Sequence, residues 1–192
     1  TTTAINLAAA FGEMGYRVLA VDLDPQCNLT QHAGFDPDNL SPTIYDAFKA
    51  EIEGYESNVQ GSIYETDEKF HLLPAQAELS LIELALINTL SRERVLTTIL
   101  GDVVDQYDYI LIDCNPSLGL LVVNALTAAS SVIIPIQTEY LAARGALMIL
   151  SSIETVRRKK LNADLVIDGI LLTMADTRTT LTRDILAAID NQ

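Results

Sequence analysis

The sequence predicts an α/β fold with a mostly parallel β-sheet flanked by helices on both faces. Two observations support this prediction. Residues 17–24 and 107–113 are nearly continuous apolar runs, as expected for strands that are buried on both faces of a parallel sheet. Segments with helical periodicity alternate with these and further strand-like runs along the chain, which is typical of βαβ units.

A helix is expected at the start of the chain, followed by a buried strand. Ile5, Ala8 and Phe11 share one helical face, and Gly15 suits a helix C-cap. The strand over 17–24 ends in carboxylates and is followed by a proline. The first two predicted elements are therefore a helix and then a buried strand.

The next stretch predicts turns and one short helix. Ser41 and Pro42 suit the N-cap and first position of a helix that runs through residue 49. Residues 51–69 are acidic and polar without a clear period, which indicates an exposed insertion.

Strands and helices then alternate to the end of the chain. Strands are predicted at 70–74, 107–113, 131–137 and 165–173. Helices are predicted at 76–90, 91–106, 118–129, 141–160 and 180–190. No repeat or linker interrupts this order, so residues 1–192 are expected to form a single domain.

Composition limits the classes of function. Hydrophobic residues make up 49% of the 192, enough for a substantial core. The net charge of −14 argues against electrostatic binding of the surface as a whole to nucleic acid or to an anionic membrane. It is compatible with a local basic patch. There is no apolar run long enough to span a bilayer. Two cysteines, Cys27 and Cys114, are too few for a disulfide scaffold and suit a reduced cytoplasmic protein, in which we expect them to be small buried residues.

Acidic residues follow two of the predicted strands. Asp22 and Asp24 end the first strand, and Asp113 ends the strand over 107–113. Ligands of open α/β sheets bind beyond the carboxyl ends of the strands. An apolar strand that ends in aspartate is typical of a Walker B element, which holds the water shell of Mg²⁺. The alternative is a solvated aspartate that caps the next helix.

Three threonines open the first predicted helix. Hydroxyl groups and free N–H groups at a helix N-terminus form an anion site, and a P-loop ends in a Ser or Thr that binds Mg²⁺. An ordinary capping sequence would look the same. A dinucleotide-binding fold would explain Asp22 or Asp24 but leaves Asp113 without a role, so a P-loop NTPase-like fold accounts for more residues.

These motifs resemble the ParA/Soj-type partition ATPases, a branch of the deviant Walker A (ParA/MinD) superfamily. The similarity covers nearly the whole chain, with the motifs in the family's order. Residues 116–119, after Asp113, and residues 137–140 favour ParA over MinD. Neither cysteine stands in the cluster-ligand context of nitrogenase iron protein. The stretches that carry the resemblance are 1–10, 17–28, 107–119, 134–140 and 169–174.

The resemblance implies ATP and Mg²⁺ as cofactors. Thr1 would ligate Mg²⁺, and Asp113 would hold the water shell of the metal. Asp24 would orient or activate the attacking water, with support from Asp22. Thr2 would contact the α-phosphate, and the further nucleotide-binding positions would be Pro116, Met174 and Asp176.

The resemblance also implies an ATP-dependent homodimer that binds DNA without sequence preference. A ParB-type centromere-binding protein would stimulate hydrolysis, in a cytoplasmic, nucleoid-associated cycle without a membrane. Arg178 and Arg183 are candidate DNA contacts, while the basic run 157–160 is more typical of a solvated helix end.

Two alternatives remain beside a DNA-partition ATPase. One is a catalytically weak scaffold, and the other is a ParA-like ATPase that positions a cargo other than DNA. In the family the glycine-rich loop and its lysines precede Thr1, and further segments follow the last helix. We therefore expect residues 1–192 to be part of a longer ATPase and not to hydrolyse ATP by themselves.

Overall fold

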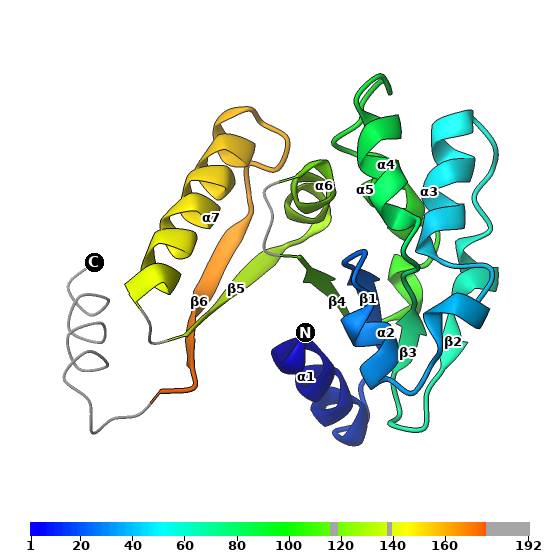
Figure 1. Ribbon diagram of the computed structural model, residues 1–192, viewed down its shortest axis with the longest axis horizontal. Helices are drawn as coiled ribbons and strands as arrows, with labels where there is room; N and C mark the ends of the chain where they lie inside the picture. The colour runs from blue at the N-terminus through cyan, green and yellow to red at the C-terminus, as the bar shows by residue number, and fades with distance from the viewer. Residues whose placement is uncertain (116–118, 138–139, 176–192) are drawn as a thin grey trace. The chain divides into compact units, whose positions relative to one another are not determined.

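The computed structural model describes residues 1–115, 119–137 and 140–175 (Figure 1). The chain divides into two compact units, residues 1–128 and residues 129–192. Both units combine helices with parallel strands, which confirms the predicted α/β class. The expectation of a single domain stays a prediction.

A four-stranded sheet with the order β2-β3-β1-β4 organises the first unit. Its strands are β1 (Val18–Leu23), β2 (Tyr64–Glu65), β3 (His71–Leu73) and β4 (Tyr109–Cys114). β1 runs parallel to both β3 and β4, and only the two-residue β2 is antiparallel to its neighbour. The sheet is therefore mostly parallel, as predicted.

Helices cover both faces of this sheet. α1 and α2 pack against one face, and α3, α4, α5 and α6 contribute to the core on the other (Figure 1). The α-helices are α1 (Thr2–Glu13), α2 (Asn28–His32), α3 (Ile44–Glu53), α4 (Leu79–Leu86), α5 (Val95–Gly101) and α6 (Leu120–Ala128). Short 3-10 helices occur at Pro37–Asn39, Val59–Ser62 and Val104–Gln106.

The central strand β1 is buried along its whole length. Leu19, Val21 and Leu23 belong to the core shared with α3 to α6. Val18 and Ala20 point to the opposite face, toward α1 and α2. Because side chains alternate across a strand, burial on both faces explains the uninterrupted apolar sequence of β1.

The start of α3 differs from the expectation. Thr43, not Ser41, is the N-cap, because its hydroxyl accepts a hydrogen bond from the Tyr45 N–H at 3.3 Å. The Asp46 carboxylate accepts a hydrogen bond from the Thr43 N–H at 2.8 Å, which completes a capping box.

The predicted exposed insertion over 51–69 is wrong in part. α3 continues to Glu53, and β2 lies within this stretch. Val59 and Ser62 are buried, Val59 within the core. Ser57, Val59 and Ser62 are the buried residues of this stretch, and because two of the three are polar, the hydrophobic pattern of the sequence does not show their burial.

The two helices predicted over 76–106 are shorter than expected. α4 spans Leu79–Leu86 and α5 spans Val95–Gly101. Between them the chain turns at Ser91, which has a φ of 53° and accepts a hydrogen bond from the Arg94 N–H at 2.8 Å.

The second unit contains two parallel strands joined through a helix, β5 (Ser131–Gln137), α7 (Tyr140–Arg158) and β6 (Val166–Thr173). Its buried residues include Ile134 and Ile136 on β5 and Ile153 and Val156 on α7. The helix predicted at 180–190 lies outside the described residues.

None of the helices in the described part of the chain has the combination of length and apolar character that a bilayer crossing requires.

The close approach of α1 to the turn before β3 generates a stability prediction. A Cβ added at Gly12 would lie 2.4 Å from the Lys69 carbonyl oxygen, so backbone would have to move. Gly12→Ala is expected to lower the free energy of unfolding by about 1 to 3 kcal/mol. Urea unfolding followed by circular dichroism measures this.

Gly101 at the end of α5 is the matched control, because nothing lies within 4 Å of a Cβ built there. Gly101→Ala should be neutral or stabilising by up to about 1 kcal/mol. Equal losses for both variants would show that the contact with Lys69 is not the cause.

Candidate functional site

The parallel pairing of β1 and β4 places two of the predicted aspartates side by side. The register sets Asp22 opposite Asp113 and Leu23 opposite Cys114. Both aspartates lie at the carboxyl ends of their strands, and both are almost fully buried. The sheet therefore brings together carboxylates that are 91 positions apart in the sequence, as the position of the strand ends predicted.

Asp22 is held by a network of donors. Its Oδ2 accepts hydrogen bonds from the Thr30 hydroxyl at 2.7 Å and the Thr30 N–H at 2.8 Å, and its Oδ1 accepts one from the Asp24 N–H at 3.2 Å. The Thr30 hydroxyl in turn accepts a hydrogen bond from the Ala75 N–H at 3.0 Å. Thr30 thus links the ends of β1 and β3, a role that the sequence analysis missed.

Burial dominates the acidity of Asp22. Removal from water raises the pKa of its carboxyl group to about 6, the hydrogen bonds from Thr30 oppose this shift, and the charge of Asp113 adds to it. A buried carboxylate with this many donors is a positioned group, because its two oxygens are fixed by partners on two different elements.

Asp113 lies against the N-terminus of α1. Its Oδ1 is 2.8 Å from the backbone nitrogen of Thr1, the N-cap residue of that helix. Its Oδ2 is buried and has no hydrogen-bond partner among the described residues. A buried carboxylate oxygen without a partner is costly, so this atom is suited to accept a hydrogen bond from a bound ligand.

Asp24 stands immediately beyond the end of β1. It is 6% exposed, and its Oδ1 accepts a hydrogen bond from the Gln26 N–H at 3.0 Å. The charges of Asp24, Asp22 and Asp113 all act on the thiol of Cys114. The three carboxylates therefore surround one region at the carboxyl edge of the sheet.

This donor set fits a hard cation that is held indirectly. Within the described part of the chain, no three His, Cys, Asp or Glu side chains form a cluster able to hold a metal ion by themselves. One carboxylate at a helix N-terminus that also carries hydroxyl groups suits Mg²⁺, which keeps several waters and takes further oxygens from a phosphate group.

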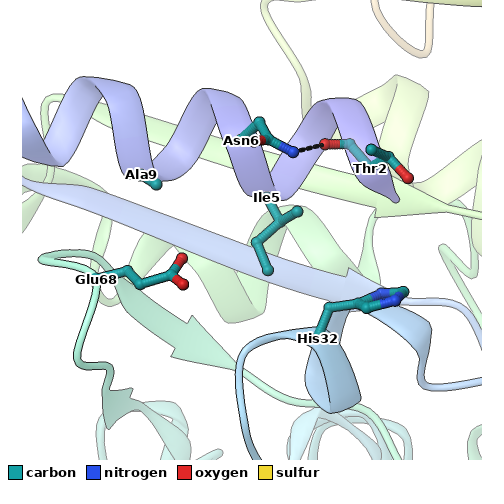
Figure 2. A pocket seen from close by; sticks show the side chains of 6 residues that line it. All are labelled: Thr2, Ile5, Asn6, Ala9, His32 and Glu68. Carbon is teal, nitrogen blue, oxygen red and sulfur yellow. Dashed lines mark hydrogen bonds between the residues drawn. The ribbon is translucent and has the colours of Figure 1, made fainter.

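Figure 2 shows an open pocket along α1 beside this site. Thr2, Ile5 and Asn6 line it from α1, His32 from α2, and Glu68 from the turn before β3. Thr2 is exposed there, and its carbonyl oxygen accepts a hydrogen bond from the Asn6 side chain at 2.8 Å. Of the predicted site residues that the structure describes, Thr2 is thus the one that borders this pocket.

The two cysteines are not reactive groups. Burial raises the thiol pKa of both Cys27 and Cys114 to about 12, and the neighbouring carboxylates add to the shift. Both remain free thiols in the structure. Cys27 is buried, as the sequence indicated, whereas Cys114 is half-buried.

The remaining predicted site residues lie in the second unit or outside the described residues. Met174 belongs to the second unit, is 83% exposed and has a φ of 53°. Within the basic run 157–160, Arg157 donates a hydrogen bond to the Leu165 carbonyl oxygen at 2.7 Å and so joins α7 to the start of β6. Pro116, Asp176, Arg178 and Arg183 lie outside the described residues.

The Thr30 network generates a prediction. Thr30→Val removes a donor to the Asp22 carboxylate and leaves the Ala75 N–H buried without its acceptor. The free energy of unfolding should fall by about 2 to 4 kcal/mol. Thr127→Val is the control, because the Thr127 hydroxyl bonds only back to the Val123 carbonyl of its own helix at 2.7 Å, and we expect a loss below about 1 kcal/mol. Similar losses in urea unfolding would contradict the network.

Comparison with known proteins identifies the family. A family model described as "AAA domain" matches residues 1–167. The sporulation initiation inhibitor protein Soj of Bacillus subtilis is 42% identical over 181 residues, which cover 94% of this chain and 70% of Soj. The chromosome partitioning protein ParA of Myxococcus xanthus is 40% identical over 190 residues, which cover 98% of this chain and 65% of that protein.

A solved structure has the same fold. The crystal structure described as cobyrinic acid a,c-diamide synthase from Mycobacterium smegmatis, with bound ADP and magnesium, superposes with a TM-score of 0.90. It is 40% identical in sequence, and the match covers 100% of this chain and 76% of that one. The chain described here belongs to the AAA-domain family and, within it, to the ParA/MinD-type partition ATPases.

Proposed function

We propose that this chain is the nucleotide-hydrolysing part of a DNA-partition switch that uses ATP and Mg²⁺. The observation that carries the proposal is the arrangement around Asp113, which pairs with Asp22, contacts the start of α1 through Oδ1 and has a buried Oδ2 without a partner among the described residues. A relative of 40% identity was solved with ADP and magnesium, which supports the same ligands here.

Asp113, Thr1 and the first turn of α1 would position the metal ion and the phosphate groups. Asp113 Oδ2 would accept a hydrogen bond from the metal's water shell, and the Thr1 hydroxyl would ligate the metal. The N–H groups of the first turn of α1 have no acceptors within the helix and would donate to phosphate oxygens. The metal ion, when bound, neutralises charge on the phosphate groups.

Asp24 and Asp22 would act on the attacking water. Asp24 would accept a hydrogen bond from that water and orient it for in-line attack on the γ-phosphate. Asp22 is a positioning residue, because one of its oxygens accepts the Asp24 N–H while the other is occupied by Thr30. Catalysis in this scheme comes from placement and charge neutralisation, with no covalent intermediate.

The proposed cycle continues beyond hydrolysis. The ATP-bound protein is a homodimer that binds DNA without sequence preference, and a ParB-type protein stimulates turnover and release. Relatives named for chromosome partitioning support this role. The chain spans 58% to 72% of the curated relatives' lengths.

Hydrolysis is tested with the protein expressed from its complete reading frame. Asp24→Ala should lower kcat at least about 100-fold, because the water loses its orienting acceptor. Asp113→Asn should raise the Mg²⁺ concentration needed for half-maximal turnover. Phosphate release with and without duplex DNA measures both quantities.

Asp105→Ala serves as the control for these variants, because Asp105 is exposed on a 3-10 helix away from the strand ends. A protein whose turnover survives Asp24→Ala would contradict the catalytic assignment. Tight nucleotide binding without turnover in the wild type would instead favour the scaffold.

DNA binding has its own test. The ATP-bound protein should bind random-sequence duplex DNA with an affinity that falls steeply as salt rises, because the chain's net charge of −14 confines any contact to a local patch. Arg178→Ala and Arg183→Ala should each weaken binding and reduce the salt slope by about 1. Lys49→Ala, at an exposed position of α3, is the control.

An ATP-bound protein that does not bind duplex DNA at low salt would contradict the proposed role in DNA partition. It would favour a cargo other than DNA for the same ATPase.

A further inference from the structure

Glu83 on α4 lies against the start of α6, the helix that follows the Asp113 strand. Its Oε1 accepts a hydrogen bond from the Leu121 N–H at 3.4 Å. The first turn of α6 contains no acidic residue of its own. The first N–H groups of a helix need hydrogen-bond acceptors and favour negative charge nearby. Glu83, on α4, therefore supplies the negatively charged acceptor that the first turn of α6 lacks.

Gly119 brings the backbone directly onto the same carboxylate. A Cβ added at Gly119 would lie 1.8 Å from Glu83 Oε1 and 2.7 Å from its Cδ. The absence of a side chain at this position therefore allows the chain to run against the Glu83 carboxylate. An alanine here would push the flexible end of Glu83 away, since no backbone atom obstructs it.

Asn124 fixes the same turn of α6 from its other side. Its side-chain amide donates hydrogen bonds to the carbonyl oxygens of Arg92 at 2.8 Å and Leu120 at 2.9 Å. Its Oδ1 accepts a hydrogen bond from the Leu96 N–H at 3.0 Å, and the residue is fully buried. The segment that joins α4 and α5 is thereby attached to α6.

These contacts hold Gly119 and the first turn of α6. Gly119 follows Asp113 by six positions in the sequence, and the pairing of β4 with β1 holds Asp113 opposite Asp22. A displacement at Gly119 therefore arises close in the sequence to the Asp113 carboxylate.

We propose that Glu83 is a positioning residue of the hydrolytic site, which holds Gly119 and the first turn of α6, six positions beyond Asp113 in the sequence. The inference rests on the proposed ATPase function. Glu83 does not touch nucleotide or metal in this scheme. It acts on turnover through the placement of the Asp113 carboxylate.

The first test is kinetic and uses the protein expressed from its complete reading frame. Glu83→Ala should lower kcat about 10- to 100-fold and raise the Mg²⁺ concentration for half-maximal turnover, with a smaller change in the KM for ATP. Glu83→Gln should restore part of the rate, because its amide oxygen accepts the Leu121 hydrogen bond without the charge. Glu53→Ala, at an exposed glutamate that ends α3, should match the wild type.

A double-mutant cycle tests whether Glu83 acts through Gly119. Gly119→Ala should lower kcat by displacing the carboxylate, and it should have little further effect once Glu83 is alanine. Losses that multiply independently would overturn the proposed contact.

The second readout needs no turnover. Hydrogen exchange of the backbone amides over 119–124, measured without nucleotide, should speed up at least about 10-fold in Glu83→Ala and Gly119→Ala and stay unchanged in Glu53→Ala. Unchanged exchange in Glu83→Ala would overturn the proposal. Faster exchange with wild-type kcat and Mg²⁺ dependence would overturn it as well, because Glu83 would then be purely structural.

A wild-type protein without ATP turnover would contradict the proposed function. In that case unchanged hydrogen exchange in the Glu83 variants would still separately refute the contact.

Discussion

The parallel register between β1 and β4 is the constraint on which the rest of the site depends. It sets Asp22 opposite Asp113, on the sheet face that α1 and α2 cover. At the opposite end of these strands, the Arg17 guanidinium and N–H both bind the Asp108 carboxylate, with the closest contacts at 2.8 Å. A shift of one residue would turn either aspartate toward the other face, because side chains alternate along a strand.

The site buries the carboxylates of Asp22, Asp24 and Asp113 at the carboxyl edge of the sheet. Burying Asp22 is costly, and its raised pKa reports that cost. The donors of Thr30 and the Asp24 backbone offset part of it. Asp113 is satisfied at one oxygen only among the described residues. Asp113 Oδ2 is therefore a buried acceptor at the edge of the sheet, where a bound ligand can donate a hydrogen bond to it.

Much of this arrangement was predictable, because it follows from local sequence properties. Uninterrupted apolar runs indicated doubly covered strands, and their final aspartates indicated the edge at which a ligand binds. The Thr30 network was not predictable, since the Thr30 hydroxyl joins Asp22 to Ala75, which lies 45 positions after Thr30 in the sequence. The cap of α3 was misplaced because Ser41 and Thr43 are both good N-caps by residue type, and only the backbone conformation decides between them.

A crystal structure of the complete protein with Mg²⁺ and a non-hydrolysable ATP analogue would test the central claim most directly. We expect the metal beside Thr1, with a water of its shell hydrogen-bonded to Asp113 Oδ2. A nucleotide bound elsewhere, or an Asp113 carboxylate that remains without a hydrogen bond to the metal's waters, would contradict it.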